Sequence, residues 1–371
     1  MRRSPLLDRP GASPNAEGDP DELVPAHYGD PLREQGLLES GAGVTALARD
    51  VVAVTGPDRL SWLTTLSSQA LTGLTPDDGG VETLLLDARG RISHALAALD
   101  DAETLWLVTE AGRGPALVEF LERMRFMLRV EVSVRDDVAV VAALGEGLER
   151  LETAISASPA VCLGVWRDPW PGVVEGGTSY DVGLTRAHPG SNYRAGLALV
   201  AEDALGAVVD AFLAVAPERG LAGSSAWEAL RVEAGRPRWA READERAIPH
   251  ELDWLRTAVH LTKGCYPGQE TVARTLNLGK PPRRLAILQL DGLAGALPEP
   301  GAVVRLGERA AGVATSVVRH HDLGPMALAL LRRGVPADAA LAVEVAESTE
   351  GAENTESDGP AVLTRVDAAQ E

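Results

Sequence analysis

The order of strands and helices constrains the fold of this chain more than any other feature of its sequence. Apolar residues at helical spacing predict helices over 115–127, 201–215 and 226–232. Short apolar runs between turn residues predict strands at 50–54, 81–87, 91–99, 104–108, 128–134, 138–144 and 161–166. These elements lack the regular alternation of a doubly wound parallel sheet. The sequence therefore predicts an α+β fold.

The pattern changes after Pro281-Pro282, which mark a domain boundary. Runs at 285–290, 302–306, 312–319 and 326–331 are short and separated by Gly and Pro turns, as in a small β-barrel or sandwich. Residues 1–24 lack periodicity, and 344–371 hold eight acids against one Arg. We therefore expect a disordered N-terminal extension over 1–24, a core over 25–280, a β-barrel over 281–343 and a disordered acidic tail over 344–371.

Composition excludes several classes of protein. The chain carries 54 acidic and 35 basic residues, a net charge of −19, and only 4% aromatic residues, which disfavours direct nucleic-acid binding. No apolar stretch approaches the roughly 20 residues that span a bilayer. Met1-Arg2-Arg3 is followed by prolines instead of an apolar signal segment. Two cysteines are too few for a disulfide framework, so we expect a cytoplasmic protein without membrane partners.

The most informative segment is Lys263–Arg274, which contains one of the two cysteines and one of the two lysines of the chain. If residues 263–265 are extended, the side chains of Lys263 and Cys265 point to the same side. Pro267-Gly268 predicts a turn, and a helix then begins at Gln269. A thiol beside an ammonium and before a helix N-terminus is typical of a reactive or metal-seeking cysteine. The alternative is that Cys265 is a structural cysteine buried in a tight turn. We interpret the other cysteine, Cys162, as a core residue because it lies in an apolar run.

The sequence Lys263-Gly-Cys-Tyr-Pro-Gly-Gln-Glu270 resembles the motif of the YgfZ family, folate-binding proteins needed for iron–sulfur enzyme function. That family is a branch of the superfamily containing the aminomethyltransferase T-protein of glycine cleavage. Weaker landmarks occur in the right order, at 54–58, 86–90, 230–235, 248–254 and 312–316. The resemblance implies two interleaved α+β domains and a C-terminal β-barrel, arranged as a ring around a central folate pocket.

The resemblance also implies roles for individual residues. Glu233 matches the glutamate that binds the pterin ring of tetrahydrofolate or a derivative, and a carboxylate can accept parallel N–H bonds from such a ring. Cys265, with its thiolate favoured by Lys263, would perform the thiol chemistry. Three further residues would shape the folate site: Gln269, Glu270 and Arg274. The arginines at 231, 236, 238, 241 and 246 are expected to form mostly a solvated, ion-paired face, although some could bind the glutamate tail of folate.

The chain departs from the T-protein at the strand after Gly90. The T-protein carries an acidic pair there, whereas this chain has His94-Ala95, which argues against glycine-cleavage aminomethyl transfer. We interpret His94 as a strand histidine with a satisfied hydrogen bond. We predict no metal site within the chain: Cys162 is distant from Cys265, and His320-His321 is expected to be a surface turn. Other ligands of any cluster would come from a partner.

These observations favour a tetrahydrofolate-binding accessory protein that supports iron–sulfur cluster assembly or repair, with an indirect effect on tRNA modification. Its partners would be iron–sulfur apo-proteins or assembly factors. The alternative is a folate-dependent one-carbon transferase, so whether the protein is an enzyme stays open. A third hypothesis is a binding module in which the folate is structural.

Overall fold

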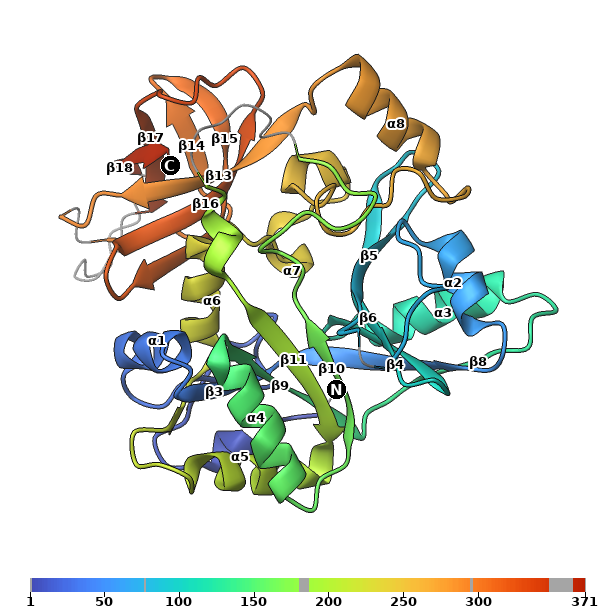
Figure 1. The fold of residues 1–371 in the computed structure, drawn as a ribbon. Helices are drawn as coiled ribbons and strands as arrows, with labels where there is room; N and C mark the ends of the chain where they lie inside the picture. Colours follow the sequence, from blue (N-terminus) through green and yellow to red (C-terminus); the bar gives the residue numbers. More distant parts are fainter. Residues whose placement is uncertain (1, 77, 180–186, 294–295, 347–362, 371) are drawn as a thin grey trace, which may run out of the picture.

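The computed structural model describes residues 2–76, 78–179, 187–293, 296–346 and 363–370. Within these ranges the chain forms mixed α/β structure with two five-stranded sheets, a six-stranded closed sheet and a two-stranded sheet near the N-terminus (Figure 1). Every helix in the same ranges is too short or too polar to cross a bilayer.

The first five-stranded sheet has the order β10-β11-β9-β3-β12. Its strands, in chain order, are β3 (Gly43–Leu47), β9 (Val138–Leu144), β10 (Cys162–Arg167), β11 (Ala195–Ala201) and β12 (Gly220–Leu221). The second has the order β5-β6-β7-β4-β8. Its strands are β4 (Arg49–Thr55), β5 (Val81–Leu86), β6 (Ile92–Asp100), β7 (Thr104–Glu110) and β8 (Glu131–Val134). Strands β3 and β9 are neighbours in the first sheet, and all five strands of the second sheet lie between them in the sequence. The second sheet is therefore an insertion into the first.

Helices cover one face of each five-stranded sheet. The α-helices are α1 (Pro31–Glu39), α2 (Arg59–Leu66), α3 (Gly114–Met124), α4 (Glu146–Ala157), α5 (Leu205–Leu213), α6 (Ser224–Glu233), α7 (Trp239–Glu242) and α8 (Gln269–Leu278). The 3-10 helices are η1 (Pro5–Asp8), η2 (Pro189–Asn192), η3 (Glu202–Ala204) and η4 (Pro249–Leu252). Leu63 of α2 and Leu117 of α3 pack on the second sheet, and Leu151 of α4 and Phe212 of α5 pack on the first. The opposite faces of both sheets share a central core with α6, and that core positions the site described below.

The third sheet follows the proline boundary. Its strands are β13 (Arg283–Leu290), β14 (Val303–Leu306), β15 (Arg309–His320), β16 (Gly324–Arg332), β17 (Leu341–Ala346) and β18 (Leu363–Gln370). The order β13-β16-β15-β14-β17-β18 closes because β18 also pairs with β13. Val232 of α6 packs against Ile287 and Leu328 of this sheet, which joins it to the central core.

The structure differs from the predicted disorder over residues 2–24 and over two short parts of 344–371. Residues 2–24 are packed on the core: Leu6 is 1% exposed, β1 (Ser13–Pro14) pairs with β2 (Pro25–His27), and Asp21 forms an ion pair with Arg238. Residues 344–346 belong to β17, and 363–370 form β18. The rest of the predicted acidic tail, 347–362 and 371, lies outside the described residues. The composition of these segments does not reveal that they are ordered, because residues that they contact, such as Arg238, are far away in the sequence.

Candidate functional site

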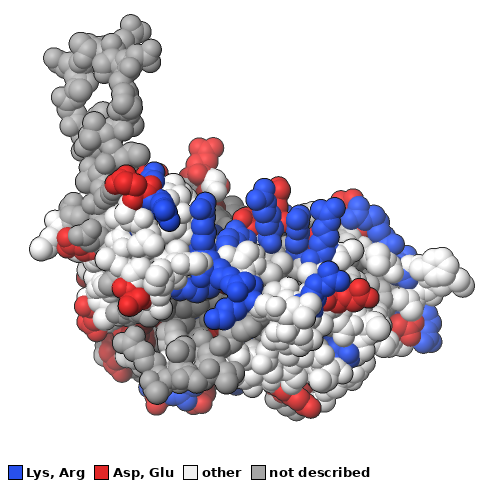
Figure 2. All heavy atoms as spheres, turned by 90° about the horizontal axis from the view of Figure 1, so that it is seen from above, with Lys and Arg blue, Asp and Glu red and all other residues white. Residues whose placement is uncertain are grey.

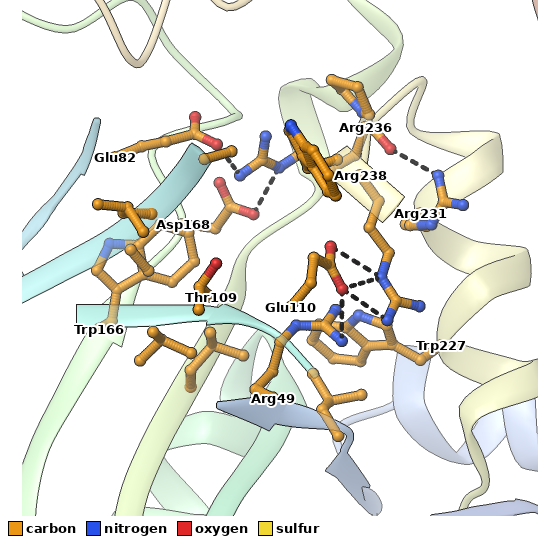
Figure 3. Close-up of a pocket in the computed structure, with 18 of the residues that line it drawn as sticks. Arg49, Glu82, Thr109, Glu110, Trp166, Asp168, Trp227, Arg231, Arg236 and Arg238 are labelled. Carbon is orange, nitrogen blue, oxygen red and sulfur yellow. Dashed lines mark hydrogen bonds and ion pairs between the residues drawn. The ribbon is translucent and has the colours of Figure 1, made fainter. Parts of the chain in front are cut away.

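A pocket with a cavity volume of about 100 Å³, partly open to solvent, lies where the two sheets meet α6 (Figure 3). Its aromatic lining comes from Trp166, Tyr193, Trp227, Trp239 and Trp254. Its charged lining comes from Arg49, Glu82, Glu110, Asp168, Arg231, Arg236 and Arg238. This mixture of aromatic and polar groups is typical of a site for a small organic ligand.

One guanidinium joins two carboxylates in the pocket wall. Arg236 Nη2 lies 2.6 Å from Glu82 Oε1, and its Nε lies 2.9 Å from Asp168 Oδ2. Glu82 also accepts hydrogen bonds from Trp254 Nε1 at 2.9 Å and Thr257 Oγ1 at 2.5 Å. Burial raises the pKa of Asp168 to about 6, because the attraction of Arg236 does not offset the loss of solvent. The carboxyl group of Asp168 therefore takes up a proton closer to neutral pH than a free aspartate does.

A second ionic cluster forms the opposite wall and reaches back to the N-terminal segment. Arg238 binds the carboxylates of Asp21 and Glu110, and Arg231 binds Glu228 at 2.6 Å and Glu242 at 3.0 Å. The expectation of a solvated arginine face is wrong for Arg231, Arg236 and Arg238, which are 2%, 8% and 5% exposed. Their burial is possible because each guanidinium meets carboxylates from distant segments.

Two buried donors in the pocket wall have no hydrogen-bond partner among the described residues. They are Arg236 Nη1 and the indole Nε1 of Trp239. The guanidinium of Arg113 stacks on the Trp239 ring at 4.1 Å and holds the indole in place. A buried donor without an acceptor costs about 1–3 kcal/mol, so the pocket suits a ligand that brings an acceptor such as a carbonyl oxygen.

The cysteine segment is anchored to α2. Lys263 Nζ donates to the backbone carbonyls of Thr64 and Ser67, the second at 2.7 Å, and lies 4.7 Å from the ring centre of Tyr266. A compact ammonium therefore binds the carbonyls at the end of α2. Burial lowers the pKa of Lys263 to about 8. Cys265 is exposed, so the alternative of a buried structural cysteine is wrong.

The turn before α8 packs on the β5–β6 turn. Gly268 has φ +81°, and a Cβ there would lie 2.7 Å from the Asp87 carbonyl oxygen. Gly90 has φ +77°, and a Cβ there would lie 2.9 Å from Thr271 Cβ. As the sequence predicts, the helix begins at Gln269. Glycine at both positions allows the two turns to meet.

The six predicted site residues do not converge on the pocket. Lys263, Cys265, Gln269, Glu270 and Arg274 lie along one segment, where Gln269 Nε2 donates to the Lys263 carbonyl at 3.5 Å and Glu270 and Arg274 are exposed. Glu233 is at the end of α6, with its carboxylate 3.3 Å from His320 Nε2. Two residues along a helix correspond to a rotation of about 200°, so Glu233 faces away from Arg231. Among the described residues, none of the six lines the pocket.

The sequence did not predict that these carboxylates and aromatic residues line a pocket, or that Arg236 Nη1 and Trp239 Nε1 are buried donors without a partner among the described residues. A usable signal was the segment Arg236-Pro-Arg-Trp239, where two arginines flank a proline beside a tryptophan. A large aromatic residue such as Trp239 is usually buried, so its presence argues against a fully solvated arginine face. The structure places all four residues of this segment in the pocket lining. Asp168 and Glu82 carry no comparable local signal.

Three other interpretations need correction. His94 is 6% exposed, its Nδ1 has no hydrogen-bond partner among the described residues, and burial lowers its pKa to about 4. Cys162 is exposed instead of lying in the core. His320 is 3% exposed, so His320-His321 is not a simple surface turn.

Glu39, His320 and His321 bring potential ligand atoms within 4.8 Å of one another. Nδ1 of His320 accepts hydrogen bonds from the backbone N–H groups of Asp322 and Leu323. The proton of the neutral imidazole is therefore on Nε2, which opposes metal binding through that nitrogen.

Comparison with known proteins identifies relatives over most of the chain. No protein-family model matches. The tRNA-modifying protein YgfZ of Klebsiella pneumoniae is 27% identical over 259 residues, 69% of this chain and 73% of that protein. YgfZ of Edwardsiella ictaluri is 27% identical over 300 residues, 79% of this chain and 85% of that protein. A putative chloroplastic transferase of Arabidopsis thaliana is 38% identical over 98 residues, so this chain matches only 21% of its length.

A solved structure has the same fold. The glycine cleavage system aminomethyltransferase T of Bartonella henselae superimposes with a TM-score of 0.71 and 18% sequence identity, over 98% of this chain and 94% of that one. Together with the relatives, this match confirms the resemblance that was based on residues 263–270.

Proposed function

This chain is a YgfZ relative with the aminomethyltransferase T-protein fold, and on that basis we propose that it binds tetrahydrofolate or a derivative and supports iron–sulfur cluster assembly or repair in the cytoplasm. The observation that carries the proposal is the pocket between the two sheets, which combines aromatic rings, a buried carboxylate and two orphan donors. These groups fit a pterin ring, which presents adjacent N–H donors, a carbonyl acceptor and a flat face.

Within this proposal, Asp168 takes the role that the resemblance assigns to Glu233. The Asp168 side chain is 6% exposed and lines the pocket, whereas Glu233 is 40% exposed and faces His320. A carboxylate accepts two N–H bonds from one ring edge. Arg236 Nη1 and Trp239 Nε1 would donate to the ring carbonyl, and Trp166 and Trp227 supply aromatic contact area. The folate itself would supply a one-carbon unit.

Cys265 would supply the thiol chemistry outside the pocket. Its exposure leaves the sulfur accessible to an iron–sulfur apo-protein or assembly factor, and one thiolate would provide one cluster ligand while the partner provides the others. Lys263 would hold the segment on α2 and place a positive charge near the sulfur.

The alternative of a one-carbon transferase lacks a carboxylate on the part of β6 that lines the pocket. The β6 residues in the pocket lining are Ala95, Leu96 and Ala97, and none carries a charge. His94 instead lies near Phe120 of α3, with 6.4 Å between ring centres. We therefore favour the accessory role. The relatives are named tRNA-modifying proteins, and we propose that this chain affects tRNA modification indirectly, through enzymes that need clusters.

Binding in the pocket is tested by titrating the protein with tetrahydrofolate and following tryptophan fluorescence. We expect saturable quenching that Asp168→Asn weakens and that the exposed control Asp210→Asn leaves unchanged. A linear response without saturation in the wild-type protein would exclude the pocket as a folate site.

The thiol role is tested in cells that lack the protein. Complementation with wild-type protein or with Cys162→Ala is expected to restore iron–sulfur enzyme activities, whereas Cys265→Ala is expected to fail although it binds tetrahydrofolate normally. Full restoration by Cys265→Ala would remove the cysteine from the mechanism and would favour a module in which folate is structural.

A further inference from the structure

The surface around Cys265 is basic, although the chain as a whole has a net charge of −19. We define the basic patch as residues 87–91 and 263–280, which meet where Gly90 packs on Thr271 and Gly268. The patch contains five cationic side chains and two carboxylates, Asp87 and Glu270, so it carries an excess of three positive charges. The five are Arg89, Arg91, Lys263, Arg274 and Lys280. Figure 2, viewed from above Figure 1 and so from the side that carries α8, shows basic side chains gathered across this face.

The cations of the patch are not neutralised by neighbours. Within the described ranges, no ion pair involves any of the five, and Lys263 contacts backbone carbonyls. Elsewhere, some surface arginines pair with carboxylates: Arg123 with Glu119, Arg129 with Asp58 and Arg150 with Glu146. Unpaired cations on one face attract anionic partners and raise their rate of encounter.

We propose that the basic patch docks an acidic surface of a partner protein and thereby delivers that partner to Cys265. The inference rests on the proposed function, because it names the partner surface that the thiol would serve. A compact acidic protein fits better than RNA for two reasons. A long polyanion would extend beyond the patch onto a chain with 54 acidic residues. Phe126 is the only aromatic among the exposed large apolar residues of the described chain, and it lies outside the patch, so no platform for base stacking is present there.

The second cysteine provides an internal control. Cys162 is also exposed, and the acid near its thiol, Glu152, is neutralised by an ion pair with Arg167 at 2.7 Å. The two thiols of one chain therefore differ in their electrostatic surroundings: Cys265 lies among cations without ion pairs in the described chain, and Cys162 lies beside a neutralised pair. An anionic reagent is expected to prefer Cys265, and a cationic reagent is expected to lose that preference.

The field at each thiol is measured with disulfides of opposite charge, using Cys162→Ser and Cys265→Ser to leave one thiol at a time. The thiolate attacks one sulfur of dithiobis(nitrobenzoate) or of cystamine, a mixed disulfide forms, and one thiolate is released. The ratio of the anionic rate to the cationic rate is expected to be about tenfold higher for Cys265 than for Cys162. In 1 M salt, where the Debye length is about 3 Å, the difference should disappear. Equal ratios at low salt would overturn the proposal.

Charge reversal identifies the residues responsible. The triple variant Arg89→Glu, Arg274→Glu and Lys280→Glu changes exposed side chains without ion pairs in the described chain. It is expected to abolish the anionic preference of Cys265. The matched control replaces the exposed residues Arg33, Arg309 and Arg319, which lie outside the patch, with Glu. This control changes the total charge by the same amount and should retain the preference of Cys265 for the anionic reagent. If both triples behave alike, total charge and not the patch controls the rate.

The class of partner is tested by protection of Cys265 from neutral iodoacetamide. A glutamate-rich 20-residue peptide is expected to slow alkylation in the wild-type protein and not in the patch triple. Stronger protection by a 20-nucleotide single-stranded RNA would overturn the acidic-protein assignment in favour of nucleic acid. None of these assays requires folate, so a failed tetrahydrofolate titration would reject the proposed function and leave the patch result standing.

Discussion

Arg238 and Asp21 form a bidentate ion pair across 217 residues of sequence, with Nη1 2.5 Å from Oδ2 and Nη2 3.0 Å from Oδ1. Asp21 is 1% exposed and Arg238 is 5% exposed. The pair joins the N-terminal segment to the wall of the pocket, because Arg238 also contacts Glu110 of β7. Residues 13–28 are therefore part of the structure that supports the site.

Breaking this pair is expected to destabilise the whole protein. Asp21→Asn leaves the Arg238 charge buried with one partner fewer, which costs about 3–5 kcal/mol in comparable buried pairs. Urea unfolding followed by tryptophan fluorescence measures the loss. Asp8→Asn removes a carboxylate from the exposed pair with Arg3 and should leave the midpoint unchanged. Equal midpoints for wild type and Asp21→Asn would show that the N-terminal segment does not support the pocket.

The contact between the β5–β6 turn and α8 is tested at Gly90. Gly90→Ala is expected to lower stability and to change the alkylation rate of Cys265, because the new methyl group meets Thr271. Gly112 is the matched control: its φ is also +77°, and a Cβ there meets nothing within 4 Å. The backbone cost of about 1–2 kcal/mol is common to both variants. If Gly112→Ala alters Cys265 reactivity to the same extent, the effect is not transmitted through this contact.

Lys263 is expected to titrate near pH 8, since burial lowers its pKa from 10.5 to about 8. Below pH 8 both the native and the unfolded states hold the proton, and the group adds no pH dependence. Between about pH 8 and 10.5 only the unfolded state holds it, so the free energy of unfolding rises with pH across this window. Carbon-13 NMR of the reductively methylated protein measures the midpoint, and Lys280→Arg assigns the signal. A midpoint of 10.5 for Lys263 would contradict its burial against α2.

Affinity for tetrahydrofolate is expected to fall below about pH 6, where Asp168 takes up a proton and loses its acceptor capacity. Asp168→Asn should weaken binding about 10- to 100-fold at pH 7.5, as loss of a hydrogen bond to a charged group costs about 1.5–3 kcal/mol. Because the pKa is raised, the native state binds this proton more tightly than the unfolded state. Its contribution to stability is complete below about pH 4 and is lost as the pH rises through 6. An unchanged pH profile in Asp168→Asn would assign the effect to another group.

Local signals in the sequence predict local structure well. The turn at Pro267-Gly268, the start of α8 at Gln269 and the strands on either side of Gly90 follow from turn residues and apolar runs. The resemblance of residues 263–270 to YgfZ also leads to the correct fold. The interaction of Lys263 with the end of α2 has no such signal, because its carbonyl partners are 196 and 199 residues away.

The pocket depends on pairings that composition does not encode. Arg236 meets Glu82 across 154 residues and Asp168 across 68. Glu233 shows the limit of a motif match, because its helix turns the carboxylate toward His320 of the closed sheet. Residues 1–24 have the composition of a disordered segment, and the order of residues 2–24 comes from Leu6, Val24 and Asp21 contacting the folded core.

The insertion of the second sheet between β3 and β9 makes it a replaceable unit. The chain enters that sheet at Arg49 and leaves it at Arg135, whose backbone N–H donates to the Val51 carbonyl at 2.8 Å. Entry and exit therefore lie side by side, which is the geometry that lets one unit be grafted into another without disturbing its host. Residues 49–135 bring β6 and β7 to the pocket, so exchanging this unit between homologues would transplant one wall of the site in a single genetic step.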